Sequence, residues 1–288
     1  MTDPAVVCVG GGHGAAAALG AVRQFAGSVT AVISVADDGG SSGRLRAMLD
    51  VVGVGDLRRC LVALAEEPER WRGLFEHRFG AGELEGHPVG NLVLSGLVEL
   101  HGDLLVALEQ AARLMGCVGR VLPATAEPVV LEATTAVGTV LGQARITTTP
   151  GVERVRVRPS DPTVPLEVID AISGADLIVL GPGSLYTSVL AAVAPPALTA
   201  AITEARGRLV YLANLRPQEP ETAGYSVADH LDALDRHGIA PYLVVCDTSR
   251  GIELGAVDLE VLDVVLTNGR SLIHDATKLA AVLFPLAP

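Results

Sequence analysis

The sequence predicts an α/β fold in three layers, in which a mostly parallel sheet is covered by helices on both faces. Two observations lead to this prediction. Apolar segments of four to seven residues recur without polar alternation, which is typical of strands that are buried on both faces. Between them lie stretches whose apolar residues recur at intervals of three and four, as expected of helices that connect parallel strands.

The predicted elements alternate along the chain. The predicted strands are Ala5–Val9, Val29–Val35, Leu177–Leu180, Leu209–Ala213 and Tyr242–Cys246, and the predicted helices are Ala15–Phe25, Ser226–His237 and Asp275–Phe284. The spacing of Ser226 and Asp229 indicates a capping box at the start of a helix, which makes Asp229 a structural residue.

Two insertions interrupt the alternation. Residues 56–115 have a helical pattern, in which Pro68 begins one helix and Asp103 caps another. Trp71 is interpreted as a packing residue on an amphipathic helix. Residues 119–158 contain the short runs "VVLEATTA", "TVLGQARI" and "VERVRVR", which predict antiparallel hairpins. Because no Ser/Pro/Gly linker separates these parts, residues 1–288 are expected to form one domain.

Composition limits the classes of function. Of the 288 residues 49% are hydrophobic, and the formal net charge is -12, the wrong sign for general attraction to nucleic acid or to an anionic membrane. The four cysteines form no CxxC pattern and are expected to be reduced packing residues. The N-terminus does not look like a signal peptide, and no apolar run is long enough to span a bilayer, so a cytoplasmic protein is expected.

A glycine-rich loop, "CVGGGHG", follows the first predicted strand. Glycines between a buried strand and a helix N-terminus allow close approach to a phosphate, which the free amides attract. Gly10, Gly12 and Ala15 also fit the dinucleotide pattern G-x-G-x-x-A, with Asp37 near the place of a ribose-binding acid. A tight turn without a ligand remains the alternative. His13 lies inside this loop and is a candidate ligand residue.

A second loop, "ADDGGSSGRL", follows the second predicted strand. Its backbone amides, the hydroxyls of Ser41 and Ser42 and the guanidinium of Arg44 suit a phosphate or a sugar hydroxyl. Asp37 and Asp38 suit a divalent cation, with Mg²⁺ the one cofactor considered, or a sugar. The alternative is that one of these carboxylates caps a helix and the other is solvated.

Two more loops end predicted strands and are expected at the same sheet edge. "GPGSL" is a third strand-to-helix turn that suits an anion, and the loop after Ala213 carries Asn214, Gln218, Glu221 and Thr222. His87, in "EGHPVGN", is a further candidate, although a loop histidine is as often a packing residue. No Ser/His/Asp or Cys/His nucleophilic arrangement is recognisable from spacing.

Seven motifs together carry a family resemblance. "VGGGHG", "VADDGGSSGRLR", "GDLRRCLVALA", "EGHPVGNLVLSGL", "GRVLPAT", "ADLIVLGPGSLYTSVL" and "NLRPQEPETAGYSVADH" resemble the gluconeogenesis factor family (YvcK-like), which is related to 2-phospho-L-lactate transferase (CofD-like). The resemblance implies a Rossmann-like three-layer fold, UDP-sugar binding, and a role in carbon flow to cell-wall precursors and in cell shape on gluconeogenic carbon sources. The pocket it implies comprises Gly11, Gly12, Asp37, Asp38, Ser41, Ser42, Arg44, Asp56, Arg58, His87, Asn91, Gly183, Ser184, Tyr186, Asn214 and Gln218.

Three functions remain open. The first is a non-catalytic regulator that binds a nucleotide sugar such as UDP-N-acetylglucosamine. The second is a phosphotransferase that uses Mg²⁺ held by Asp37 and Asp38. The third, a nicotinamide-dependent oxidoreductase, rests on the glycine pattern alone. Neither a nucleic acid nor a membrane partner is expected, and a homo-oligomer is left open.

Overall fold

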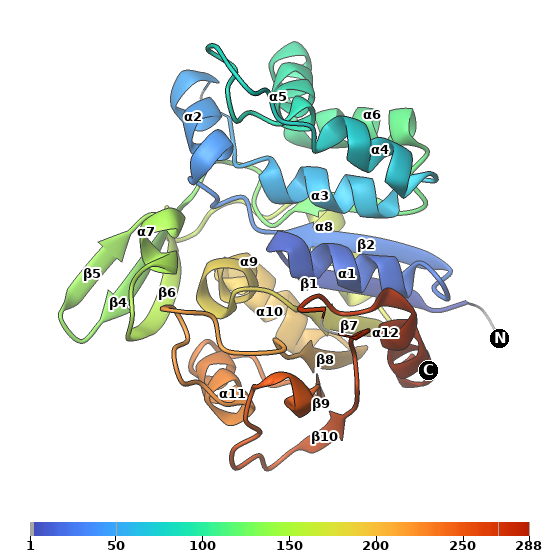
Figure 1. Ribbon diagram of the computed structural model, residues 1–288, viewed down its shortest axis with the longest axis vertical. Helices are drawn as coiled ribbons and strands as arrows, with labels where there is room; N and C mark the ends of the chain where they lie inside the picture. Colours follow the sequence, from blue (N-terminus) through green and yellow to red (C-terminus); the bar gives the residue numbers. More distant parts are fainter. Residues whose placement is uncertain (1–2, 50, 270, 288) are drawn as a thin grey trace.

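The computed structural model describes residues 3–49, 51–269 and 271–287, and its centre is a seven-stranded sheet in which every neighbouring pair is parallel. The strand order is β10-β9-β8-β7-β1-β2-β3 (Figure 1). The strands are β1 (Ala5–Gly10), β2 (Ser28–Ile33), β3 (Arg120–Pro123), β7 (Leu177–Leu180), β8 (Arg208–Leu212), β9 (Leu243–Cys246) and β10 (Glu260–Asp263). This confirms the predicted α/β fold, and all four residues of β7 and of β9 are buried, as their unbroken apolar runs predict.

Two strands of the large sheet differ from the expectation. Residues 119–158 were expected to form hairpins only, but β3 joins the large sheet as a parallel neighbour of β2, so that part of the prediction is wrong. β3 ends in Pro123, which has no amide hydrogen to donate, and it can pair in this way because it is an edge strand. The other edge strand, β10, is short and half exposed, with the pattern Glu-Val-Leu-Asp, and sequence reasoning missed it.

Helices cover both faces of the sheet. In Figure 1, α1 (Gly12–Val22), α3 (Gly55–Leu64) and α12 (Ala276–Leu283) lie in front of the strands, while α8 (Leu166–Ser173) and α10 (Pro196–Glu204) lie behind them. The short α9 (Leu190–Val193) is completely buried and continues a π-helical turn, η1 (Leu185–Val189). Among the described residues no single helix is long and apolar enough to cross a membrane, although η1–α9 and α10 together, bent by 78°, reach that length and composition.

A cluster of helices extends from one edge of the sheet. It contains α2 (Gly40–Leu49), α4 (Pro68–Phe75), α5 (Val89–His101) and α6 (Leu104–Met115). Pro68 begins α4 and the Asp103 carboxylate accepts a bond from the Val106 amide at the start of α6, as predicted. Trp71 packs edge-on against the buried Phe75. Although α3 falls within the predicted insertion, it packs on α1 and belongs to the front layer.

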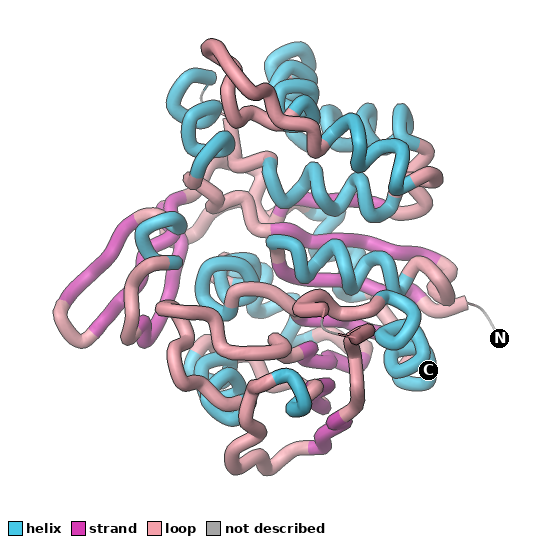
Figure 2. Tube along the Cα trace, viewed as in Figure 1, coloured by secondary structure: helices cyan, strands magenta, loops and turns pink. Residues whose placement is uncertain are grey.

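A small antiparallel sheet stands apart from the large one, as Figure 2 shows. Its order is β5-β4-β6, with β4 (Val130–Thr135), β5 (Gly138–Leu141) and β6 (Val152–Arg158). These strands are the predicted hairpins, but Gln143–Thr147 forms the short helix α7 rather than a continued strand. Beside this sheet, α11 (Val227–Arg236) begins with the predicted capping box of Ser226 and Asp229.

Candidate functional site

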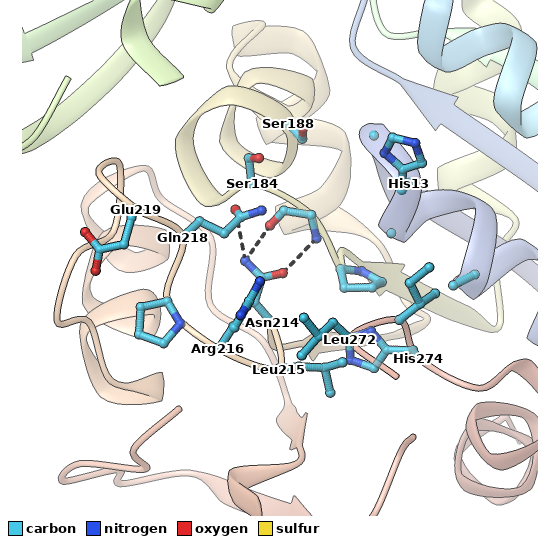
Figure 3. A pocket seen from close by; sticks show the side chains of 17 residues that line it. His13, Ser184, Ser188, Asn214, Leu215, Arg216, Gln218, Glu219, Leu272 and His274 are labelled. Atoms are coloured by element: carbon cyan, nitrogen blue, oxygen red, sulfur yellow. Dashed lines mark hydrogen bonds between the residues drawn. The ribbon is translucent and has the colours of Figure 1, made fainter. Parts of the chain in front are cut away.

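A cleft of about 750 Å³ lies at the carboxyl ends of three neighbouring strands, β1, β7 and β8. The strand order reverses between β1 and β7, and open α/β sheets bind their ligands in the crevice outside such a switch point. The cleft is lined by the start of α1, by the turn after β7 and by the loop after β8 (Figure 3). Of the predicted residues, those that line it are Gly12, His13, Gly183, Ser184, Asn214 and Gln218.

The first glycine loop is shaped by close contacts with the rest of the protein. A Cβ atom on Gly14 would lie 2.2 Å from the Pro182 carbonyl oxygen, so only glycine lets α1 meet the turn after β7. A Cβ on Gly11 would lie 2.8 Å from the Asp56 carboxylate. These glycines therefore serve the packing of the loop against the turn after β7 and against Asp56 of α3.

Asp56, on α3, binds the amide of Gly12, which belongs to the glycine loop that was predicted to bind an anion. Its Oδ2 accepts a hydrogen bond of 2.6 Å from the Gly12 amide, and Oδ1 pairs with the Arg59 guanidinium. Burial raises the pKa of Asp56, while Arg59 and the Gly12 amide act in the opposite direction. A ligand phosphate at this helix end must therefore use other amides or displace the carboxylate.

His13 is an exposed side chain at the same helix end and lines the cleft. Its pKa is lowered, first by partial desolvation and then by the Arg59 charge. A histidine with a lowered pKa is mostly neutral at neutral pH, so it offers a hydrogen-bond donor and an acceptor rather than a positive charge.

Asn214 ties the loop after β8 to the turn after β7. Its Oδ1 accepts from the Gly183 amide at 3.1 Å, and its Nδ2 donates to the Gly183 carbonyl oxygen at 2.8 Å. Nδ2 also approaches the Gln218 Oε1 at 3.4 Å. Figure 3 shows these three bonds beneath Ser184, so Asn214 fixes the wall of the cleft.

Glu221 fills the third turn that sequence reasoning regarded as suitable for an anion. This buried carboxylate accepts from the amides of Tyr186 and Thr187 at 2.7 and 3.2 Å, and from the Thr187 hydroxyl at 2.8 Å. It therefore satisfies the N-terminus of η1 from within the protein. Tyr186 itself lies outside the cleft lining, with its hydroxyl 3.2 Å from that of Tyr225.

The two adjacent carboxylates of the second loop have different partners. Asp37 Oδ1 accepts from the Gly39 amide at 3.0 Å, whereas Asp38 Oδ1 accepts at 2.8 Å from the amide of Ala144, at the start of α7. Asp38 thus joins this loop to α7, and neither side chain lines the cleft. No group of three potential metal-ligating side chains occurs within the part of the chain that is described. The assignment of Asp37 and Asp38 to a Mg²⁺ site stays a prediction.

Four other predicted residues form a buried polar chain between α2, α3 and α5. His87 Nδ1 is 2.8 Å from the Ser41 hydroxyl, the Asn91 amide donates to the same hydroxyl at 3.1 Å, and Arg58 donates to Asn91 Oδ1 at 2.6 Å. Burial lowers the pKa of Arg58 to about 10 and also lowers that of His87. Ser42 is buried nearby, and Arg44 is exposed and donates to the Glu85 carbonyl. These residues do not line the cleft.

A second cleft, of about 650 Å³, adjoins the first along α1. The two share His13, Ala17, Ile273 and His274. Sequence reasoning missed the segment of Leu272, Ile273 and His274, which precedes α12, and also Arg216. The position of Arg216 two residues after Asn214 in the polar loop is the one signal that could have found it.

Comparison with known proteins identifies relatives over most of the chain. The family model described as 2-phospho-L-lactate transferase CofD matches residues 6–281. A "Putative gluconeogenesis factor" from Mycobacterium tuberculosis is 46% identical over 267 residues, covering 87% of this chain and 77% of the relative. The "Gluconeogenesis factor" of Bacillus subtilis is 35% identical, and the match covers 98% of this chain and 98% of that protein. A crystal structure of a UPF0052 family member from Bacillus halodurans superposes with a TM-score of 0.92 at 34% identity, covering 99% of both chains.

Proposed function

The chain belongs to the CofD/UPF0052 family, whose similar members are named gluconeogenesis factors, and we propose that it binds a nucleotide sugar of the UDP-N-acetylglucosamine type in the switch-point cleft. In this proposal the protein is a cytoplasmic regulator that adjusts carbon flow into cell-wall precursors, and thereby cell shape, on gluconeogenic carbon sources. Binding, rather than turnover of the ligand, is its primary activity.

The position of the cleft carries the proposal. Its two sides come from the start of α1 and from the turn after β7, so a pyrophosphate between β1 and β7 would lie at both turns. Because the Gly12 and Gly183 amides bind Asp56 and Asn214, the pyrophosphate would use neighbouring amides of these turns or displace the two side chains. A volume of about 750 Å³ falls within the range of small-molecule sites. Because the net charge is -12, such an anion site depends on local amides and on nearby guanidinium groups such as Arg216.

Calorimetry and thermal unfolding test the proposal directly. A ligand that binds only the folded protein stabilises it by about 2.7 kcal/mol at a concentration one hundred times its Kd. We expect UDP-N-acetylglucosamine to raise the Tm, while N-acetylglucosamine alone and NAD do not. A flat Tm up to millimolar UDP-N-acetylglucosamine would refute the proposal, and stabilisation by NAD would favour the oxidoreductase.

One observation favours a second function, a Mg²⁺-dependent phosphotransferase. The negative charge of Asp37 contributes to the raised pKa of Asp56, so these two carboxylates lie within electrostatic reach of each other beside the glycine loop. Asp37 with Asp38, or Asp37 with Asp56 once Asp56 releases the Gly12 amide and Arg59, would hold the cation, and Mg²⁺ would neutralise a diphosphate. The test is release of a nucleotide product from a nucleotide donor with Mg²⁺. Absence of product release, together with an Asp37→Asn variant that behaves like wild type in the same assay, would exclude this function.

A further inference from the structure

His274 lies in the segment that leads into α12 and lines both clefts where they meet. The side chain is 8% exposed, and its Nε2 is buried without a hydrogen-bond partner. An unpartnered polar atom in a buried side chain costs free energy that a bound ligand can recover. Figure 3 shows His274 beside Leu272, with His13 on another side of the cleft.

The protonation of His274 follows from its surroundings. Burial lowers its pKa to about 4, against smaller opposing effects from the Ala213 carbonyl and the Asp247 charge, so the ring is neutral at neutral pH. A neutral imidazole carries its proton on one ring nitrogen only. Because Nε2 is buried without a partner while the Ala213 backbone acts on the ring, the proton is assigned to Nδ1. The remaining nitrogen, Nε2, therefore presents a lone pair to whatever approaches it.

The chemistry of this end of the cleft suits a flat, weakly polar group. Leu215, Leu272 and Ile273 are neighbours of His274 in the lining, whereas the glycine turns with their amides lie elsewhere in the same cleft. A lone pair repels a phosphate oxygen and attracts an N–H or O–H donor. An apolar wall with one acceptor is the environment in which a nucleobase edge binds.

We propose that His274 Nε2 accepts a hydrogen bond from the ring N–H of a uracil-type base and so selects the nucleotide that this cleft binds. The inference rests on the proposed function and deepens it, because it assigns the base end of the ligand. Uracil carries a donor at N3, whereas cytosine carries an acceptor there. Because Nε2 is itself buried, the base reaches it only when side chains around it move; the two residues that precede His274, Leu272 and Ile273, are 52% and 62% exposed.

Titration calorimetry with UDP and CDP on the full chain tests this assignment. We expect wild type to bind UDP at least about tenfold more tightly than CDP, since a mismatched pair leaves a buried acceptor facing another acceptor. His274→Phe keeps a flat ring and removes the acceptor, so its affinity for UDP should fall about tenfold and become equal to that for CDP. His274→Gln, which places an oxygen acceptor near the position of Nε2, should recover part of the preference.

His101→Phe is the matched control, because His101 is exposed at the end of α5 and outside both clefts. Equal affinity of wild type for UDP and CDP would overturn the inference, as would a folded His274→Phe variant with unchanged selectivity. If His274→Phe does not fold, the wild-type comparison and His274→Gln decide. If wild type binds neither UDP nor UDP-N-acetylglucosamine, the proposed function fails and this inference fails with it. If wild type binds both and only the selectivity is absent, this inference alone fails.

Discussion

Replacing Glu221 by alanine should destabilise the whole fold, although this residue lies in a surface loop after β8. The carboxylate is 2% exposed and accepts three hydrogen bonds, from two amides and one hydroxyl of η1. A hydrogen bond to a charged group contributes about 1.5–3 kcal/mol, and an unsatisfied buried donor costs about 1–3 kcal/mol. Because these contributions are not additive, we expect Glu221→Ala to lower the free energy of unfolding by about 3–5 kcal/mol.

Urea unfolding followed by the fluorescence of Trp71, the single tryptophan, measures this change. Glu219→Ala is the matched control, since Glu219 is exposed in the same loop and should change the free energy of unfolding by less than about 0.5 kcal/mol. Glu221→Gln keeps an acceptor for the two amides and should lose about 1 kcal/mol. A loss below about 1 kcal/mol for Glu221→Ala would refute the assignment of Glu221 as the cap of η1.

The same residue predicts a dependence of stability on pH. Burial raises the pKa of Glu221 above its unfolded value, so the group contributes stability that is fully present below the unfolded pKa, at about 4.3. That contribution is lost as pH rises through the folded pKa. The difference in unfolding free energy between wild type and Glu221→Gln should therefore shift in favour of the glutamine variant as pH rises from 4. A shift of opposite sign would show that hydrogen bonding to the carboxylate outweighs its desolvation.

Three further predictions concern the cleft and its supports. Asn214→Asp would place an oxygen against the Gly183 carbonyl, now 2.8 Å from Nδ2, and should weaken UDP-N-acetylglucosamine binding about tenfold or more by calorimetry; unchanged affinity would contradict the role of Asn214. Gly14→Ala should lower the free energy of unfolding by about 2–4 kcal/mol in the urea assay, because its Cβ would lie 2.2 Å from the Pro182 carbonyl oxygen. Gly96→Ala, in α5 with open space around it, should raise the free energy of unfolding by about 0.5–1 kcal/mol. Asp38→Ala should speed amide hydrogen exchange in α7 and leave α1 unchanged, because the Asp38 carboxylate accepts from the Ala144 amide; equal protection in both proteins would contradict this.

Much of the fold was predictable because burial on both faces leaves a clear pattern. β1 and β7 are continuous apolar runs, so their sequences fix their place in the middle of the sheet. Among the edge strands, β3 ends in Pro123 and β10 has a charged residue at each end, Glu260 and Asp263, so neither reads as an unbroken apolar run. Their pairing depends on neighbours that are distant in the chain.

The candidate site was predictable as a set of loops but not as a set of side-chain contacts. Gly12, Gly183 and Asn214 meet in one cleft because parallel strands bring their carboxyl ends to the same sheet edge. The partners of Asp38 and Glu221 are determined by tertiary packing, which no local spacing encodes. Nothing in the sequence indicated that the carboxylates of Asp56 and Glu221 would bind backbone amides that were expected to bind a ligand.

The pairing of β1 with β7 has a consequence for synthesis of the chain. Val6 in β1 lies beside Leu177 in β7, so one edge of the central apolar strand stays open until more than half of the chain has left the ribosome. Such an edge is a template for wrong association between nascent chains. A fragment that ends at Pro123 keeps β1, β2 and β3 but lacks β7, and we expect it to sediment as aggregates whereas the full chain remains dispersed.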